Sequence, residues 1–335
     1  MEADELPYIS VIITAYKRKD FLLNAIKSVV NQTLNKKYYE IIVIKNFRDE
    51  NIDDFINKNE IVGIISNDNS LQGKLIEALN VAKGTIISFL EDDDLFFENK
   101  LEIVYNKFNR NNKLIYYHNS MIPITGENKI LTNWYKQENG IIIGDSASKL
   151  RILRRFIEYG GHNLSSISIS RNIILKNSKI FGSSTYSLDY AILLLCLTME
   201  GLILSDSERL TLYREHTSSS HIYSKNRNEF TKNRCFVNEQ SVATFNNFRS
   251  VISSANANIK GVYSFMLSFL LIKQHFFCGS ITDVDIRKFA KLFKYRLNTK
   301  DYLMGLFLIL LIRDKSGKLK NVALNLYLKK VMNDE

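Results

Sequence analysis

The chain has 335 residues, of which 45% are hydrophobic and 24% are charged, and only 2 are proline. This balance excludes disordered, collagen-like and linker-type chains, and the length predicts one large domain or two ordinary ones. The net charge of +10 is concentrated at the C-terminal end, because residues 241–335 hold 15 basic and 6 acidic side chains.

The first 120 residues alternate between strand and helix patterns. Short apolar runs rich in β-forming residues predict buried strands at 8–15, 39–44, 61–66 and 85–90. Helical spacing of apolar residues predicts helices at 21–32, 75–83 and about 95–109. We expect Gly84 to cap the second of these helices. The alternation predicts an α/β fold with a parallel sheet covered on both faces, in which ligands bind beyond the carboxyl ends of the strands.

The rest of the chain is mixed up to about residue 225 and then helical and basic. Residues 165–170 alternate like a half-buried strand, and residues 188–200 show a helical pattern that ends at Gly201. The longest apolar runs, 261–272 and 302–312, are shorter than the roughly 20 residues that a membrane span needs. We interpret both runs as buried or interfacial helices.

The termini and the cysteines give two further expectations. The acidic start has no apolar segment, so no signal peptide is visible. The 3 cysteines, Cys196, Cys235 and Cys278, are scattered, which argues against a disulfide scaffold and against a zinc site. The pattern fits a reducing compartment.

Four consecutive carboxylates, Glu91–Asp94, directly follow the fourth predicted strand. We call this segment the acidic run. Because like charges repel, the run costs stability unless a cation binds there, and its oxygen ligands suit Mg²⁺ or Mn²⁺. The alternative is a solvated turn in which Asp94 caps the next helix. The position after a buried strand favours a ligand site.

Three other places carry candidate functional groups. Asp189 begins an apolar helix, where it is either a helix cap or a functional carboxylate. In the segment 213–216, Arg214 suits a phosphate and His216 suits a metal or a proton, although a lone histidine is more often structural. The cations that follow the first strand, including Arg18, suit a phosphate or form a solvated turn.

Taken in order, these segments resemble family 2 glycosyltransferases of the GT-A fold. The matching residues are 10–18, 28–33, 40–44, 84–94, 188–190 and 213–216, so the likeness covers about residues 7–221. The resemblance implies a catalytic domain at 1–224, followed by a helical, basic region at 225–335. It also implies an inverting enzyme that moves a sugar from a nucleotide-diphosphate sugar to an acceptor hydroxyl. The expected donors are UDP- or GDP-sugars, and the expected acceptors are glycans or lipid-linked molecules.

The resemblance also assigns roles to residues. Asp189 matches the general base that takes the proton of the acceptor hydroxyl. Glu91 and Asp93 match the two acidic positions of an Asp-X-Asp metal motif, and His216 matches a position that helps to hold Mn²⁺ or Mg²⁺. The expected contacts of the nucleotide sugar are Thr14, Ala15, Tyr16, Arg18, Asn46, Lys74, Asp92 and Arg214. The expected acceptor contacts are Trp134 and Asn163.

Three alternatives remain open. A sugar nucleotidyltransferase shares a similar sheet, but it typically has a glycine-rich loop after the first strand, and residues 14–19 contain no glycine. The basic end suggests a nucleic-acid-binding protein, but no zinc motif or stacking signature accompanies it, so we expect no nucleic acid partner. The third alternative is an inactive relative of the family. Glu91 departs from the family pattern, and Lys45 and Asn46 stand where an acidic residue often follows the second strand.

Within residues 288–296, basic residues and apolar residues both occur at helical spacing. This pattern fits a helix that lies on an anionic membrane surface. It also fits a helix packed on the catalytic domain with its basic face in water. We therefore expect a cytoplasmic protein that is peripheral on the inner face of the cell membrane.

Overall fold

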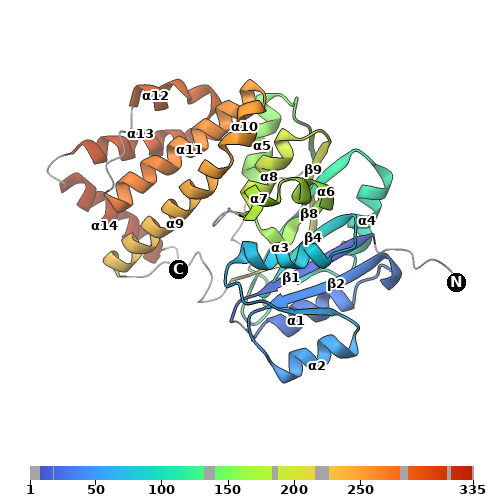
Figure 1. Ribbon diagram of the computed structural model, residues 1–335. Coiled ribbons are helices and arrows are strands. Elements are labelled where there is room, and N and C mark those ends of the chain that lie inside the picture. The colour runs from blue at the N-terminus through green and yellow to red at the C-terminus, as the bar shows by residue number, and fades with distance from the viewer. Residues whose placement is uncertain are drawn as a thin grey trace. The chain divides into compact units, whose positions relative to one another are not determined.

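The computed structural model describes residues 8–17, 19–131, 140–182, 188–215, 226–279, 286–314 and 318–333. Its contacts divide the chain into two compact units (Figure 1). The first unit comprises Met1–Ser148 and Arg155–His216, and the second comprises Lys149–Arg154 and Thr217–Glu335. The predicted boundary near residue 225 lies outside the described residues.

The first unit is built on one sheet, which has nine strands among the described residues. The strands are β1 (Ile9–Ala15), β2 (Tyr39–Lys45), β3 (Val62–Ile65), β4 (Ile86–Glu91), β5 (Leu95–Phe96), β6 (Leu114–Thr125), β7 (Ile142–Gly144), β8 (Ile167–Ser170) and β9 (Leu202–Glu215). They lie in the order β3-β2-β1-β4-β8-β6-β9-β5, and β7 pairs with β9.

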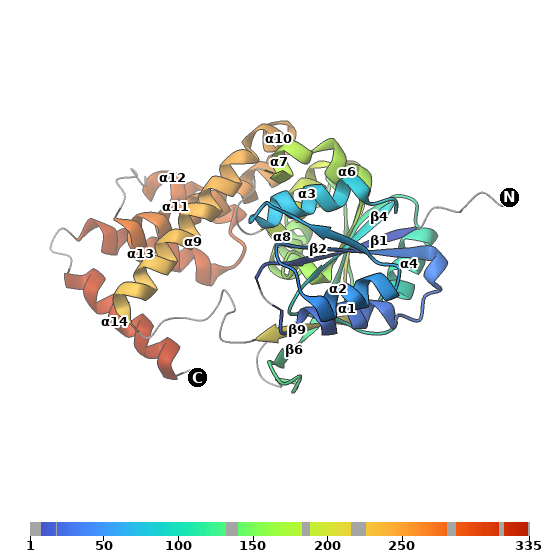
Figure 2. The same ribbon diagram turned by 60° about the horizontal axis from the view of Figure 1, so that its bottom comes forward.

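The neighbouring strands β3, β2, β1 and β4 are parallel, which confirms the prediction for the first 90 residues. Three helices make the crossovers: α1 (Leu22–Val30), α2 (Glu50–Lys58) and α3 (Leu71–Val81). Figures 1 and 2 show α3 on the opposite face of the sheet from α1 and α2. This arrangement follows from right-handed crossovers, because the strand order reverses direction between β3 and β4. Beyond β4 the sheet is mixed, since β8 is antiparallel to both β4 and β6.

The remaining elements of this unit surround the second half of the sheet. The helices are α4 (Lys100–Arg110), α6 (Arg171–Lys176), α7 (Ser178–Gly182) and α8 (Leu188–Thr198), with 3-10 turns at η1 (Lys36–Tyr38) and η2 (Leu164–Ser166). Helix α5 (Leu150–Tyr159) begins in the residues of the second unit and continues in those of the first. The predicted helix at 188–200 is thus confirmed as α8, whose residues are almost all buried.

Burial explains why the first strand and helix form where they do. All seven residues of β1 are buried, as a central strand covered on both faces requires. The buried residues of α1 are Leu22, Ala25, Ile26 and Val29. Their spacing puts them on one helical face, which packs into the same core as β1.

Three local predictions in this unit are wrong. The run 61–66 is not a buried strand, because β3 lies at the edge of the sheet and is largely exposed. The helix expected from residue 95 begins only at Lys100, since Leu95 and Phe96 pair with β9 as β5. Gly84 does not cap α3, which ends at Val81 and has Ala82 as its C-cap. Instead, a Cβ at Gly84 would lie 2.5 Å from the Ser10 backbone nitrogen, so this position admits only glycine.

The second unit is helical. Its helices are α9 (Arg227–Asn247), α10 (Arg249–Ser254), α11 (Ala257–Cys278), α12 (Ile286–Lys291), α13 (Thr299–Arg313) and α14 (Lys318–Asn333), with a 3-10 turn at η3 (Phe293–Tyr295). The two long apolar runs lie in α11 and α13, and side chains of both helices share one core, which includes Phe265, Phe289 and Tyr302. Among the described residues, only α11 is long and apolar enough to cross a membrane by length and composition.

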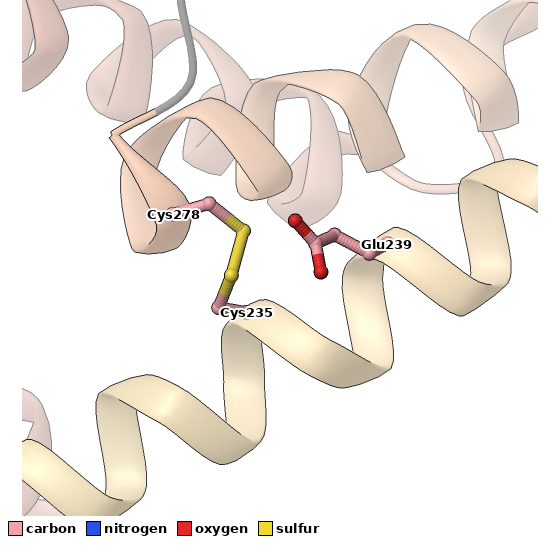
Figure 3. Close-up of side chains that lie close together, drawn as sticks. All are labelled: Cys235, Glu239 and Cys278. Carbon is pink, nitrogen blue, oxygen red and sulfur yellow. A yellow bond between two sulfur atoms is a disulfide. The ribbon is translucent and has the colours of Figure 1, made fainter.

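A disulfide joins Cys235 of α9 to Cys278 of α11, with 4.9 Å between the two Cα atoms (Figure 3). The scatter of the cysteines argues against a disulfide scaffold, and the structure nevertheless pairs these two, whereas Cys196 is free and buried in α8. The two partners are 43 residues apart, and the packing of α9 beside α11 brings them together. No local spacing could have revealed this pairing.

We expect reduction of this disulfide to lower the free energy of unfolding of the chain by about 4 kcal/mol. The unfolded chain then regains the entropy of an open loop of 43 residues. Urea denaturation with and without a phosphine reductant measures the change. The double variant Cys235→Ser/Cys278→Ser is the control, and its stability should not respond to reductant. Equal stability of the wild-type protein with and without reductant would contradict the prediction.

Candidate functional site

The carboxyl ends of β1, β2 and β4 meet at one edge of the sheet. Strand register places Thr14 of β1 between Ile44 of β2 and Glu91 of β4. Thr14 and the following Ala15 are buried, whereas Tyr16, the first residue beyond β1, is exposed. The residues predicted to hold a nucleotide sugar thus lie beside the first residue of the acidic run.

Side-chain hydrogen bonds tie together the loops that leave this edge. The Tyr16 backbone nitrogen donates to Oδ2 of Asp92 over 3.4 Å. The Lys17 nitrogen donates to Oδ1 of Asn46 over 2.9 Å, and Nδ2 of Asn46 donates to Oδ1 of Asn69 over 3.0 Å. Lys17 has a φ of 57°, in the left-handed region, so the chain turns sharply after β1. Asn46 therefore links the loops after β1, β2 and β3.

Lys74 of α3 lies under the same edge and is buried. Its Nζ donates to the carbonyl oxygens of Asp68 and Asn69 over 3.3 and 3.1 Å, and it lies 4.9 Å from the centroid of the Tyr16 ring. Burial lowers the pKa of Lys74, while the carboxylates of Asp68, Glu77 and Asp92 favour its charged form. This arrangement places a cation beside Tyr16 and Asp92.

The acidic run contains more negative charge than its surroundings neutralise. Burial raises the pKa of Glu91 well above its ordinary value, and the carboxylates of Asp93, Asp94, Asp189 and Asp92 raise it further. Burial and the neighbouring Asp93 raise the pKa of Asp94 to about 7. Oδ2 of Asp94 is buried without a hydrogen-bond partner among the described residues. A carboxylate cluster with these properties fits a hard divalent cation.

Arg214, near the end of β9, holds the acidic run in place. Its backbone nitrogen donates to Oδ1 of Asp94 over 2.9 Å, and its Nε donates to the carbonyl oxygen of Asp93 over 2.7 Å. Its Nη1 donates to the carbonyl oxygens of Thr125 and Gly126 over 3.1 and 3.0 Å. Because Arg214 is buried and most of its donors are engaged, it positions the carboxylates of the run.

Asp189 lies in the first turn of α8 and reaches the same site. Its Oδ2 accepts a hydrogen bond from the Asn163 nitrogen over 3.1 Å, and its Oδ1 accepts one from the Tyr190 nitrogen over 2.8 Å. Burial raises the pKa of Asp189 to about 6, and these hydrogen bonds oppose the shift. Since Asp189 contributes to the raised pKa of Glu91, the two carboxyl groups are within electrostatic reach of each other.

Comparison with known proteins agrees with this geometry. Residues 10–161 match the family model described as Glycosyl transferase family 2. The chain carries a family 2 glycosyltransferase domain. The fold is that of GT-A glycosyltransferases: the crystal structure of S. aureus TarS 1–349 in complex with UDP superposes with a TM-score of 0.55 at 12% identity. That match covers 96% of this chain and 87% of the TarS chain.

Two curated relatives of the glycosyltransferase domain are much longer than this chain. An uncharacterized glycosyltransferase of Rickettsia bellii is 35% identical over 127 residues, which are 37% of this chain and 18% of that protein. The poly(ribitol-phosphate) beta-glucosyltransferase of Bacillus spizizenii is 31% identical over 112 residues, which are 31% of this chain and 18% of that protein. The alignments thus cover less than a fifth of either relative.

Three predicted site residues of the glycosyltransferase domain lie outside the described residues. These are Arg18, Trp134 and His216. Asn163, the other predicted acceptor contact, is buried with a φ of 62°, and its Oδ1 accepts a hydrogen bond from the Ser165 nitrogen over 2.9 Å. Asn163 therefore lies between Asp189, which its backbone contacts, and the residues behind the acidic run.

Sequence reasoning missed the polar residues that support the acidic run from behind. Ser165 accepts a hydrogen bond from the Glu91 nitrogen at its Oγ over 3.0 Å, and its carbonyl oxygen accepts one from Nζ of Lys100. The same Nζ donates to Oγ1 of Thr211 over 2.9 Å. Burial lowers the pKa of Lys100 well below its ordinary value, which the nearby Asp94 opposes. No signal in the sequence distinguishes Lys100 from a lysine on the surface of α4.

The residue at the end of β2 also has an unexpected environment. Lys45 is buried, and its Nζ lies 2.7 Å from Oδ1 of Asp53 and 2.6 Å from the carbonyl oxygen of Phe47. Lys45, at the position where the family often has an acidic residue, therefore binds α2 and the loop that precedes it. Asn46 is the residue that faces the loops of the site at this position.

Proposed function

We propose that this protein is an inverting, metal-dependent glycosyltransferase that moves a sugar from a nucleotide-diphosphate sugar to an acceptor hydroxyl. One observation carries the proposal. A chain of hydrogen bonds joins Asp189 of α8 to the acidic run, although α8 follows that run far along the chain. Asp189 accepts a hydrogen bond from the Asn163 nitrogen, and Oδ1 of Asn163 accepts one from the Ser165 nitrogen. Oγ of Ser165 in turn accepts one from the Glu91 nitrogen. Such an arrangement provides a base for the acceptor beside a cation site for the donor.

The donor end of the site is the sheet edge formed by β1, β2 and β4. Tyr16 offers an exposed aromatic ring, Asn46 offers an amide, and Lys74 supplies a positive charge beside Asp92. These groups suit a nucleoside joined to a diphosphate. The TarS structure of the same fold was solved in complex with UDP, which supports UDP as the nucleotide.

The acidic run is the proposed cation site. Glu91 and Asp93 would hold Mn²⁺ or Mg²⁺, together with Oδ2 of Asp94, which has no hydrogen-bond partner in the part of the chain that the structure describes. When bound, such an ion would supply positive charge to balance the diphosphate. Arg214 and Lys100 are proposed to position the acidic run. Arg214 binds the run from the side of β9, and Lys100 binds Ser165 behind it.

Asp189 is the proposed general base. One of its carboxylate oxygens takes the proton of the acceptor hydroxyl while that oxygen forms a bond to the anomeric carbon. The bond between the anomeric carbon and the diphosphate breaks, and its electron pair leaves with the diphosphate. A single displacement of this kind inverts the anomeric configuration. The acceptor is a glycan, a lipid-linked molecule or a polyol phosphate, the last supported by the name of the Bacillus spizizenii relative.

The proposal is tested by thermal shift with UDP, GDP, dTDP and CMP, each with and without Mn²⁺ or Mg²⁺. A ligand that binds only the folded protein raises its melting temperature, and a concentration 100 times the Kd is worth about 2.7 kcal/mol. We expect the largest shift with UDP, and we expect it to require the metal. If none of the nucleotides shifts the melting temperature in the presence of metal, the donor site does not exist and the proposal fails.

A further inference from the structure

Helix α13 in the second unit exposes a row of large apolar side chains to solvent. Leu303, Met304, Phe307 and Leu310 are exposed by 57%, 38%, 50% and 60%. Their spacing of one, three and four residues puts them on one side of the helix, along about two turns. We call these four residues the α13 stripe. A contiguous apolar surface of this kind on a folded unit marks an interaction site.

The core of the second unit does not account for the α13 stripe, because the opposite side of the same helix already serves it. Tyr302, Leu308 and Ile309 are buried in the helical core. A Cβ at Gly305 would lie 2.5 Å from the Phe289 ring and 3.3 Å from the Phe269 ring, so α12 and α11 pack against that side. The α13 stripe is thus a second apolar face of the helix, since the first apolar face is already buried in the core.

The charges around the α13 stripe select its partner. Lys300 and Arg313 are exposed, and each lies three residues along the helix from a residue of the stripe, Lys300 before Leu303 and Arg313 after Leu310. Asp301 precedes Met304 by three residues, but it is partly buried, and its Oδ2 accepts a hydrogen bond from Nδ2 of Asn298 over 2.9 Å. Asp314, at the end of the helix, accepts one from the Leu319 nitrogen over 2.9 Å. The exposed charged side chains next to the stripe are therefore cations, one at each end.

We propose that the α13 stripe binds the surface of an anionic lipid bilayer. Leu303, Met304, Phe307 and Leu310 enter the boundary between headgroups and acyl chains, while Lys300 and Arg313 extend to the lipid phosphates. Residues 241–335 carry a net charge of +9, from 15 basic and 6 acidic side chains, so an anionic surface attracts this region as a whole. The same charge disfavours a second copy of the chain, because two such regions repel each other.

Sedimentation with vesicles tests the proposal with the full chain. One set of vesicles contains phosphatidylcholine alone, and the other contains equal amounts of phosphatidylcholine and phosphatidylglycerol. We expect the wild-type protein to bind the anionic vesicles at least about tenfold more tightly than the neutral ones, and added salt to weaken that binding. Phe307→Ser/Leu310→Ser should weaken binding to the anionic vesicles at least about tenfold.

Phe236→Ser is the matched control, because Phe236 is exposed by 58% and belongs to a different helix, α9. This variant should bind like the wild-type protein. Lys300→Gln/Arg313→Gln is a second test that removes no apolar contact, and it should weaken binding to the anionic vesicles about tenfold. All variants alter exposed side chains, so unchanged melting temperatures verify that they fold.

Several results would overturn the proposal. The wild-type protein could fail to bind anionic vesicles, or Phe307→Ser/Leu310→Ser could bind as tightly as the wild-type protein. Equal losses in Phe236→Ser and Phe307→Ser/Leu310→Ser would show that the α13 stripe has no special role. A wild-type dimer in sedimentation velocity that Phe307→Ser/Leu310→Ser converts to a monomer would assign the stripe to a second copy. The nucleotide thermal shift is independent of all these results, so it separates a failure here from a failure of the proposed function.

Discussion

Asp189→Asn is expected to slow sugar transfer by about 100- to 10,000-fold while leaving donor affinity within about twofold. The amide keeps the size of the side chain, and its oxygen can still accept the hydrogen bond from the Asn163 or Tyr190 nitrogen, but it cannot take a proton. Single-turnover rates measure the transfer step, and calorimetric titration with UDP measures donor binding. A loss of UDP affinity with normal transfer from bound donor would contradict the assignment of Asp189 as the base.

The pH dependence gives the same prediction a second readout. The pKa of Asp189 is raised to about 6, so the carboxyl group is protonated below that pH and cannot accept a proton. The wild-type rate should therefore rise with pH through about 6 and level off above it. Asp189→Asn should lose this limb of the profile. Glu200→Gln, which makes the same chemical change at an exposed position just beyond the end of α8, should retain both the rate and the limb.

Asp93→Asn is expected to reduce metal-dependent transfer roughly 1,000-fold, because the proposed cation site loses a charged ligand. The fold should be preserved, since Arg214 binds the carbonyl oxygen of Asp93, which the substitution leaves in place. Transfer rates measured over a titration of Mn²⁺ separate weaker metal binding from slower chemistry. We expect a higher Mn²⁺ requirement together with a lower maximal rate.

The control for Asp93→Asn is Glu98→Gln, an exposed carboxylate in the loop that follows the acidic run. It should leave both the Mn²⁺ requirement and the maximal rate unchanged. Normal, metal-dependent activity in Asp93→Asn would refute the cation site at the acidic run. Equal losses in the two variants would attribute the effect to the net charge of the surface.

The part of the fold that could be predicted from the sequence is the part that local patterns specify. β1 and β4 consist mostly of buried apolar residues, and α1 shows helical spacing of its apolar residues, so the local sequence predicts each of these elements. The antiparallel insertion of β8 between β4 and β6 could not be predicted, because it depends on a register between residues far apart in the chain. The two residues of β5 are too few to show a periodicity.

The residues of the candidate site likewise fall into those that could be predicted from the sequence and those that could not. The acidic run could be found from the sequence because it is consecutive and follows a strand, and Asp189 could be found from the resemblance. The roles of Ser165 and Lys100 could not be predicted, because they arise from contacts made in the folded core. The disulfide between Cys235 and Cys278 likewise depends on which helices become neighbours.

Asp189 and Arg214 lie on two consecutive elements, α8 and β9, which a short turn around Gly201 joins. The distance between the proposed base and the residue that positions the acidic run is therefore set by the combined length of a buried helix and a long strand. One residue inserted within α8 would rotate Asp189 about 100° around the helix axis relative to β9. An insertion after Glu215 would leave this spacing untouched. Variation in chain length during evolution should thus be strongly restricted between residues 189 and 214 and freer just beyond them.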